Sequence, residues 1–368
     1  MKKLGFGLMR LPLLDSEDSR SIDIEQCKKM TDLFLEKGFT YFDTAYMYHK
    51  YSSEKAVKEF LTSRHPRDSY TLTTKLPAHH NFLKTEEDNE RIFNEQLEKT
   101  GVDYFDYYLY HNLNVKNYEN ITKLNSFAFV DRMKKEGKVK NIAFSFHDTA
   151  DVLDKILTEH PEVDFVQLQI NYLDWESPSI QSRLCYETAV KHGKRVIVME
   201  PVKGGMLQRI PKEAVDLMKA YNKDASPASW AIRFAAGLEN VYMVLSGMSN
   251  MEQMEDNLSY MENFQPLNDE EMEIIKKVTK IINDKVEIPC TDCKYCVEGC
   301  PQNINIPGLF ETYNEKCQFD LDNKRSYEAY TKDKGKASDC IECGACEGSC
   351  PQSIPIIDEL KKIAKVYE

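Results

Sequence analysis

The chain has 368 residues, a net charge of −12 at pH 7 and an isoelectric point near 5.3. This length suits one domain of about 250 residues together with another of about 100. The acidic balance argues against a nucleic-acid partner, because phosphate binding depends on lysine and arginine. No apolar run approaches the roughly 20 residues that cross a membrane, and the N-terminus lacks the pattern of an export signal. We therefore expect two domains, a cytoplasmic location, and neither a membrane nor a nucleic-acid partner.

Cysteine is the most informative residue type, because eight of the eleven cysteines lie in two short clusters near the C-terminus. The other three, Cys27, Cys185 and Cys317, are scattered and are interpreted as structural. Small secreted proteins use cysteines as a disulfide framework, whereas clustered thiols in a long chain without an export signal are typical of metal binding in a reducing compartment. The two clusters therefore predict metal sites.

From Leu4 to about Tyr260, short apolar runs alternate with stretches of helical period. The eight expected strands are Leu4–Leu8, Thr40–Asp43, Tyr70–Lys75, Phe105–His111, Val139–Ser145, Phe165–Ile170, Arg195–Met199 and Val241–Leu245. Helical stretches follow them, among them Ile24–Lys37, Glu87–Lys99, Leu124–Glu136 and Met251–Met261. Such alternation predicts parallel strands joined by crossover helices. Eight such units make up a closed (β/α)8 TIM barrel, so the expected fold class is α/β.

Charged or polar residues stand at the end of nearly every expected strand. In chain order they are Asp43, Lys75, His111, Ser145 with His147, Gln169 with Asn171, Glu200, and Ser246 with Gly247. Stability alone does not explain this pattern, and the C-terminal ends of barrel strands are where such enzymes carry their chemistry. We expect these side chains to line one pocket.

The barrel pattern ends near Pro266. Asn268 with Glu271 can form a capping box for a helix that runs to about Asp284. This helix is interpreted as a packing element between two parts of the chain. The predicted domains are a barrel over residues 1–265, a helical linker over residues 266–288, and a C-terminal domain over residues 289–368.

The C-terminal segment contains an internal repeat of the form Cys-x-x-Cys-x-x-Cys-x-x-x-Cys-Pro. The first copy has Cys290, Cys293, Cys296 and Cys300, and the second has Cys340, Cys343, Cys346 and Cys350, with 39 residues between the copies. This spacing lets three thiolates from one loop and a fourth from elsewhere surround a cuboidal iron–sulfur cluster. Zinc is the alternative, but the third cysteine at the same interval and the following proline favour clusters.

The stretch Phe42–Tyr48, F-D-T-A-Y-M-Y, resembles the F-D-T-A-x-x-Y signature of the aldo-keto reductases. The resemblance implies a (β/α)8 barrel that passes a hydride between nicotinamide and a carbonyl. It makes Tyr48 the proton donor, with Lys75 beside it, Asp43 paired with that lysine, and His111 bonded to the substrate carbonyl. A tyrosine with a pKa of about 10 is a weak acid at neutral pH, so we expect Lys75 to lower the pKa of Tyr48.

The same resemblance places Ser145, Gln169 and Asn171 near the carboxamide of the nicotinamide, together with His147. Glutamine and asparagine suit an amide, because each both donates and accepts hydrogen bonds. The alternative is that these residues cap loops at the strand ends. His49, next to the predicted proton donor, is expected to face solvent.

The segment after the seventh strand departs from the family pattern. Met199 and Glu200 occupy the positions where the family commonly has a tyrosine that stacks on the nicotinamide, followed by a serine. Lys203, Gly204 and Gly205 still suit a pyrophosphate, because the lysine can neutralise it and the glycines let the backbone approach it. Dinucleotide binding is therefore expected, with an unusual surface under the nicotinamide.

After the eighth strand, the run L-S-G-M-S-N-M-E-Q-M-E-D-N resembles the segment that grips the adenosine phosphate. The candidate contacts there are Ser246, Gly247, Ser249, Gln253 and Asn257. Members of the family that prefer NADPH carry a lysine and an arginine in this segment, and here Gly247 and Gln253 stand in their places. The choice between NADH and NADPH stays open.

The cysteine repeat resembles the two-cluster bacterial ferredoxins, in which the fourth cysteine of each copy serves the other cluster. The resemblance implies one 4Fe–4S cluster on Cys290, Cys293, Cys296 and Cys350, and a second on Cys340, Cys343, Cys346 and Cys300. The long spacer departs from the compact ferredoxins and is similar to helical versions fused to oxidoreductases. We expect a small, mainly helical, ferredoxin-like domain with two clusters.

Nicotinamide transfers two electrons as hydride and an iron–sulfur cluster transfers one, so the two domains need a converter such as a flavin to exchange electrons. Three hypotheses follow. In the first, the barrel reduces a small carbonyl compound or reversibly oxidises the alcohol, and the clusters exchange electrons with a redox partner protein. In the second, the clusters are structural or redox-sensing and the barrel works without them. In the third, the barrel is a nucleotide-binding sensor or a docking subunit without turnover, and the four predicted catalytic residues count against it.

Overall fold

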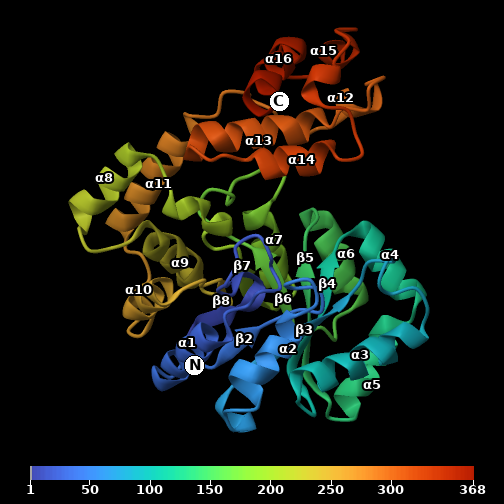
Figure 1. The fold of residues 1–368 in the computed structure, drawn as a ribbon, viewed down its shortest axis with the longest axis vertical. Coiled ribbons are helices and arrows are strands. Elements are labelled where there is room, and N and C mark those ends of the chain that lie inside the picture. The colour runs from blue at the N-terminus through green and yellow to red at the C-terminus, as the bar shows by residue number, and fades with distance from the viewer. Residues whose placement is uncertain (1) are drawn as a thin grey trace. The chain divides into compact units, whose positions relative to one another are not determined.

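The computed structural model describes residues 2–368. Eight parallel strands form a closed barrel in chain order, with β1 paired to β8 (Figure 1). They are β1 (Leu4–Gly7), β2 (Tyr41–Asp43), β3 (Thr71–Pro77), β4 (Phe105–Leu113), β5 (Val139–Phe146), β6 (Phe165–Gln169), β7 (Arg195–Met199) and β8 (Val241–Ser246). The expected α/β barrel is confirmed, and the expected strand ends differ from these by at most two residues.

Helices alternate with these strands along the chain. They are α1 (Ile24–Glu36), α2 (Ser53–Val57), α3 (Glu87–Thr100), α4 (Val115–Lys123), α5 (Ser126–Lys135), α6 (Ala150–Glu159), α7 (Ser182–Lys191), α9 (Pro227–Gly237) and α10 (Met251–Met261). Side-chain caps begin several of them: Asp23 accepts from the backbone of Gln26 in α1, and Asn250 accepts from Gln253 in α10. No helix within residues 2–368 combines the length and the apolar content that a bilayer span requires.

The interior of the barrel is filled by side chains that point inward from alternate positions of the strands. Tyr41, Tyr107, Leu109, Ala143, Phe165, Ile197, Met243 and Leu245 form one buried cluster. Gly5 leaves space for this cluster, because a Cβ atom there would lie 2.8 Å from the Leu245 side chain and 3.0 Å from the Tyr41 ring. The barrel is therefore packed rather than hollow, which leaves the strand ends as the place for chemistry.

The chain divides into two compact units. The barrel unit comprises Met1–Gly205 and Ala228–Asn268, and the second unit comprises Met206–Pro227 and Asp269–Glu368. The second unit is helical, as expected, with α8 (Lys212–Tyr221), α11 (Asp269–Asn283), α12 (Tyr295–Glu298), α13 (Ile306–Phe319), α14 (Lys324–Thr331), α15 (Ala345–Gly348) and α16 (Ile356–Tyr367). Although α8 lies between β7 and β8 in the sequence, it packs against α11 within this unit (Figure 1).

The two copies of the cysteine repeat have similar backbone conformations. Buried residues of α13 and α16 pack with Cys296 and Cys346, which lie in the one-turn helices α12 and α15. Corresponding residues of the two copies take the same left-handed conformation, with φ of 54° and 57° at Asp292 and Glu342, 66° and 74° at Lys294 and Gly344, and 52° and 51° at Asn303 and Ser353. The sequence repeat is therefore also a structural repeat.

Candidate active site and candidate metal centres

Four side chains from neighbouring elements meet at the C-terminal end of the barrel. Asp43 is the last residue of β2, Lys75 lies in β3, and His111 lies in β4. Tyr48 belongs to the loop that follows β2. Because β2, β3 and β4 are parallel, hydrogen-bonded neighbours, their C-terminal ends reach the same side of the barrel. The structure thus brings together the four residues that were predicted to be catalytic.

Lys75 is the centre of this group and is 1% exposed. Its Nζ atom donates to Asp43 Oδ1 at 2.5 Å, to the carbonyl oxygen of Thr44 at 2.7 Å and to the Tyr48 hydroxyl at 3.3 Å. These bonds use all three ammonium hydrogens. Burial by itself would lower the pKa of Lys75, but Asp43 and Tyr48 more than offset burial and raise the pKa. The lysine is therefore held as a cation.

The pKa of Tyr48 is raised above its ordinary value. Burial raises it most, Lys75 lowers it, and Asp43 raises it again. The expected effect of Lys75 has the right sign, but burial outweighs it, so the prediction of a lowered pKa is wrong for the net shift. The phenol consequently keeps its proton at neutral pH, which is the form that a general acid needs.

The ring of His111 packs edge-on against the ring of Tyr48, with 5.8 Å between the ring centroids. Burial, with smaller contributions from the charges of Lys75 and His147, lowers the pKa of His111 to about 3. The Nδ1 atom is buried and has no partner within residues 2–368. His111 is therefore a neutral imidazole at neutral pH, with one N–H donor and one acceptor nitrogen.

The loop after Tyr48 is held by His49, which does not face solvent as expected. His49 is buried; its Nε2 accepts from the backbone of Leu11 at 3.2 Å, and its Nδ1 donates to the carbonyl oxygen of Ser19 at 2.7 Å. The left-handed φ angles of His49, Lys50 and Tyr51, from 50° to 72°, explain why this loop needs such support. The pattern Y-H-K-Y gave no signal of this role.

A buried polar network beneath Lys75 was also not predicted. Gln96 of α3 donates to Glu54 Oε1 at 2.7 Å and to the carbonyl oxygen of Lys75 at 3.0 Å, and it accepts from the Tyr108 hydroxyl at 2.7 Å. Thr74 donates to the same oxygen of Glu54 at 2.7 Å. Burial raises the pKa of Glu54, and the bonds from Thr74 and Gln96 partly offset this. The network fixes β3 at the residue that carries the ammonium group.

The carboxylate of Asp174 accepts hydrogen bonds from two side-chain amides at the end of β6. Gln169 donates to Asp174 Oδ2 at 3.0 Å and Asn171 donates to the same oxygen at 2.8 Å. The Oδ1 atom of Asn171 accepts from two backbone N–H groups of the following loop. Ser145 accepts from the backbone of Asn112 at 2.7 Å, which leaves its hydroxyl hydrogen available. Asn171 thus acts as a loop cap in the structure, and the contacts of these residues with a carboxamide stay predictions.

The end of β7 carries a charged residue in a strained conformation. Glu200 has a φ of 54°, and its carbonyl oxygen accepts from Asn171 Nδ2 at 3.2 Å. Burial raises the pKa of the Glu200 carboxyl group, Lys203 lowers it and Asp174 raises it. Lys203, expected to meet a pyrophosphate, donates to Asp174 Oδ1 at 2.8 Å. Gly204 follows with a φ of 64°, a conformation that suits glycine.

The end of β8 is tied to α10. Asn257 donates to the Ser246 hydroxyl at 2.9 Å and accepts from the Tyr260 hydroxyl at 2.5 Å. Gln253 accepts from the backbone of Ser249 at 2.7 Å. Gln253 thus stabilises the start of α10, where exposed N–H groups and the helix dipole suit an anion, and Asn257 ties the middle of the helix to β8. Their contacts with an adenosine phosphate stay predictions.

Arg10, at the end of the turn after β1, was not singled out from the sequence. A Cβ atom on Gly247 would lie 3.3 Å from the Arg10 side chain, and the Ser249 hydroxyl donates to the Arg10 carbonyl oxygen at 2.8 Å. The position of Arg10 directly after the first strand was the signal in the sequence that could have identified it. Arg10 therefore adds a guanidinium group to the β8 side of the barrel mouth.

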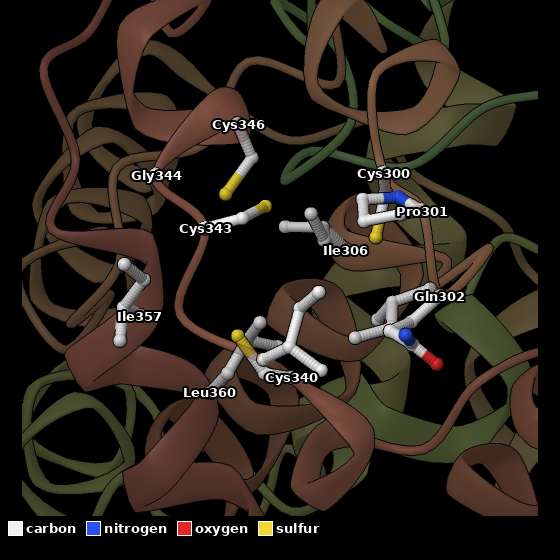
Figure 2. Close-up of a pocket in the computed structure, with 12 residues that line it drawn as sticks. Cys300, Pro301, Gln302, Ile306, Cys340, Cys343, Gly344, Cys346, Ile357 and Leu360 are labelled. Carbon is white, nitrogen blue, oxygen red and sulfur yellow. The ribbon is translucent and has the colours of Figure 1, made fainter.

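Two cavities in the second unit are lined by the cysteine repeat. One, with an empty volume of about 320 Å³, has Cys300, Cys340, Cys343 and Cys346 around it (Figure 2). The other, of about 310 Å³, has Cys290, Cys293, Cys296 and Cys350. The remaining lining residues are mostly apolar, and each cavity takes its fourth cysteine from the other copy of the repeat. The cavities thus group the cysteines in the same two sets as the ferredoxin resemblance.

The donor set of each cavity suits a cluster. Four thiols that surround one cavity match the ligands of a cuboidal iron–sulfur cluster. Within residues 2–368, no three His, Cys, Asp or Glu side chains converge on a position for a single metal ion. The eleven cysteines are all free thiols, and Cys27 and Cys185 are buried in the barrel unit, while Cys317 is half-buried in the second unit.

Comparison with known proteins follows the same division of the chain. Residues 3–280 match the model of the aldo/keto reductase family, and residues 289–354 match the model of a 4Fe-4S dicluster domain. An aldo-keto reductase of Mycobacterium avium is 26% identical over 287 residues, which are 77% of this chain and 89% of that protein. Acetyl-CoA decarbonylase/synthase complex subunit alpha 1 of Methanosarcina acetivorans is 32% identical over 76 residues, which are 21% of this chain and 8% of that subunit.

Solved structures share the barrel. The aldo-keto reductase AKR11C1 from Bacillus halodurans in its holo form has a TM-score of 0.59 at 23% identity, over 75% of this chain and 91% of that chain. An aldo-keto reductase from Klebsiella pneumoniae in complex with NADPH has a TM-score of 0.57 at 17% identity, over 75% of this chain and 90% of that chain. Because the family model covers most of the chain, this protein belongs to the aldo/keto reductase family and is an oxidoreductase of that family with a C-terminal 4Fe–4S dicluster domain.

Proposed function

We propose that the barrel reduces a small carbonyl compound, or reversibly oxidises the corresponding alcohol, with NADH or NADPH. The observation that carries this proposal is the bonded set of Asp43, Lys75 and Tyr48, with the His111 ring against Tyr48. A carbonyl that accepts hydride develops negative charge on oxygen. A protonated phenol, a cation behind it and a neutral imidazole N–H are the groups that such an oxygen requires.

The residues divide the chemistry as follows. Nicotinamide, when bound, supplies or accepts the hydride. Tyr48 passes its proton to the carbonyl oxygen, and Lys75 stabilises the phenolate that remains. His111 donates a hydrogen bond to the same oxygen from one ring nitrogen. Asp43 keeps Lys75 charged and in place, since the two are joined in a buried ion pair.

The dinucleotide would be held by residues at the ends of β5 to β8. The support is the hydroxyl hydrogen that Ser145 has available, the left-handed glycine turn at Gly204, and the N-terminus of α10. The Klebsiella pneumoniae aldo-keto reductase described above was solved in complex with NADPH, and another aldo/keto reductase from Klebsiella pneumoniae was solved in complex with NADP and acetate. The proposed contacts are Ser145, Gln169, Asn171, Glu200, Lys203, Gly204, Ser246, Gly247, Ser249, Gln253 and Asn257, with Asn171 acting through the loop that it caps.

The second unit is proposed to hold two 4Fe–4S clusters, one in each thiol-lined cavity. Cys290, Cys293, Cys296 and Cys350 would ligate one, and Cys340, Cys343, Cys346 and Cys300 the other. Such clusters transfer one electron at a time. A redox partner protein is proposed to exchange these electrons, which agrees with the similarity to a subunit of a multi-subunit complex. Thiolate ligands of this kind suit a cytoplasmic location.

Coupling between the clusters and the barrel would need a converter such as a flavin, bound in the barrel or in the partner. An anaerobic absorption spectrum of the purified chain tests it. Coupling predicts that NADH or NADPH bleaches the broad cluster band when the converter is present. An unchanged spectrum, with carbonyl reduction intact, would contradict coupling and assign the clusters a separate role.

The general-acid role is tested by Tyr48→Phe. We expect turnover of model carbonyls, such as nitrobenzaldehyde and diacetyl, to fall about a hundredfold or more, with the fold retained. Tyr46→Phe is the matched control, because Tyr46 carries a phenol nearby that is bonded to Glu95 rather than to Lys75. A folded, fully active Tyr48→Phe would refute the role. A wild-type chain that binds dinucleotide but never turns over would favour the sensor hypothesis instead.

A further inference from the structure

Strand β4 has an irregularity directly after His111. Tyr110 pairs with Phe144 of β5, but the next pair along the two strands is Leu113 with Phe146. Strand β4 therefore advances three residues where β5 advances two, so β4 contains a β-bulge with one extra residue. Bulges of this kind are common next to active sites, where they change the direction of a side chain.

Asn112 lies within the bulge, and both of its backbone polar groups are bonded to side chains. Its N–H group donates to Ser145 Oγ at 2.7 Å, and its carbonyl oxygen accepts from Asn117 Nδ2 at 2.7 Å. Both partners are buried, whereas the side chain of Asn112 is exposed. Asn112 has a left-handed φ of 59°, a conformation that asparagine adopts more readily than most residues. The two buried partners therefore hold the backbone in a conformation that an ordinary strand residue would not take.

The extra residue determines which face of the sheet the end of β4 presents. The β5 partners of Tyr110 and Leu113 lie two residues apart and so share one face, which their partners on β4 also share. The Tyr110 ring lies against the ring of Phe127 in α5, with 4.5 Å between the centroids, so this is the outer face of the barrel. In a regular strand, Leu113 would instead follow His111 on the inner face. The bulge thus buries Leu113 on the outer face, away from the side to which His111 points.

We propose that the bulge is a positioning device for His111. Asn112 and its two side-chain partners hold the end of β4 so that the imidazole stands beside Tyr48, where the two rings pack edge-on. This inference rests on the proposed function, in which His111 donates a hydrogen bond to the carbonyl oxygen. Asn112 and Asn117 act through His111 and are positioning residues. Ser145 holds the bulge with its oxygen atom and keeps its hydroxyl hydrogen for the carboxamide.

Substitution of Asn112 tests this role, because its side chain is exposed and its backbone conformation is what matters. Asn112→Val should lower kcat for carbonyl reduction about tenfold to a hundredfold. A β-branched side chain is disfavoured at this φ, and a small displacement of His111 misaligns its hydrogen bond. The affinity for NADH or NADPH, measured by calorimetric titration, should change little. Asn112→Gly should retain most of the turnover, because glycine adopts the same φ without strain.

Asn125→Val is the matched control. Asn125 is also exposed and left-handed, with a φ of 52°, but it begins α5 and does not follow His111. This variant should unfold at a lower temperature, as Asn112→Val should, and keep its turnover. A loss of stability by itself would therefore not explain a loss of kcat in Asn112→Val.

A second comparison separates positioning from a general loss of structure. In a chain that carries His111→Ala, Asn112→Val should lower kcat no further, because the group that the bulge positions is absent. Asn117→Leu removes the bond to the Asn112 carbonyl oxygen at similar side-chain volume, and it should lower kcat in the otherwise wild-type chain even if Asn112→Val folds poorly.

The outcomes distinguish the role of the bulge from the proposed function. An equal fold-loss of kcat from Asn112→Val with and without His111 overturns the positioning role and leaves the proposed function standing. Full turnover by both Asn112→Val and Asn117→Leu does the same. A wild-type chain that never reduces a carbonyl compound overturns the proposed function and the positioning role together.

Discussion

The barrel mouth and the cysteine loops hold their functional groups in different ways. At the mouth, the ammonium group of Lys75 is bonded to three oxygens, and Gln96 ties the same stretch of β3 to α3. In the second unit, eight thiols line two cavities, and the helices beside them, α12 and α15, are one turn long. The first site is fixed by the protein itself. The second is built from loops, and we expect their order to depend on the clusters that are proposed to bind there.

The two sites therefore differ in what maintains their geometry. A preformed site on strands keeps its geometry when its ligand leaves, and it is sensitive to changes in charge because its polar groups are buried. A site made of short turns loses its order with its metal, because metal binding contributes directly to folding. The two units should therefore respond to different perturbations.

The largest expected effect is in the cysteine loops. Cys346→Ala removes a buried thiol that lines one cavity. We expect iron and sulfide to fall from about eight to about four per chain, and the second unit to unfold at a lower temperature. Carbonyl reduction and the unfolding of the barrel should stay close to the wild type. Iron and sulfide analysis with calorimetry under anaerobic conditions measures both.

Cys317→Ala is the matched control for this loss. Cys317 packs against the same core as Cys346 but lines neither cavity. It should keep the full iron content. Full iron retention in Cys346→Ala would contradict the ligand assignment, and joint unfolding of the barrel with the second unit would contradict the separation of the two sites.

Local patterns in the sequence predict part of the fold and part of the candidate sites. The strands could be predicted because parallel barrel strands are short apolar runs with regular spacing, and Asp43 and Tyr48 because they share one motif. The spacing of the repeat predicted cluster sites, and the resemblance to the two-cluster ferredoxins supplied the two cysteine sets, because it assigns the fourth cysteine of each copy to the other cluster.

The remaining features depend on contacts between distant segments. Gln96 and Asp174 show no special pattern in the sequence, and their importance comes from Lys75 and Lys203, which lie 21 and 29 residues away in the chain and approach them only after folding. Lys75 lowers the pKa of Tyr48 as expected, but the net shift is upward because burial outweighs it, and the extent of burial is a property of the whole fold. Packing decides such quantities, so a motif cannot give them.

The smaller expected effect is at the barrel mouth and depends on pH. The pKa of His111 is about 3 in the folded chain, against an ordinary value of 6.5. Above pH 6.5 the imidazole is neutral in both the folded and the unfolded chain, so it does not change the free energy of unfolding. As the pH falls from 6.5 towards 3, the unfolded chain binds a proton that the folded chain excludes, so stability is lost in this window. The loss should reach about 2 kcal/mol at pH 5.

His111→Gln removes this titration and keeps a side chain that can donate and accept. Its free energy of unfolding, measured with urea from pH 8 to pH 4.5, should fall less steeply than that of the wild type below pH 6.5. His80→Gln, at an exposed position of the loop after β3, should follow the wild type. Parallel curves for His111→Gln and the wild type would mean that His111 takes up its proton in the folded chain. The mouth would then not be a preformed neutral donor site, and the contrast with the cysteine loops would lose its basis.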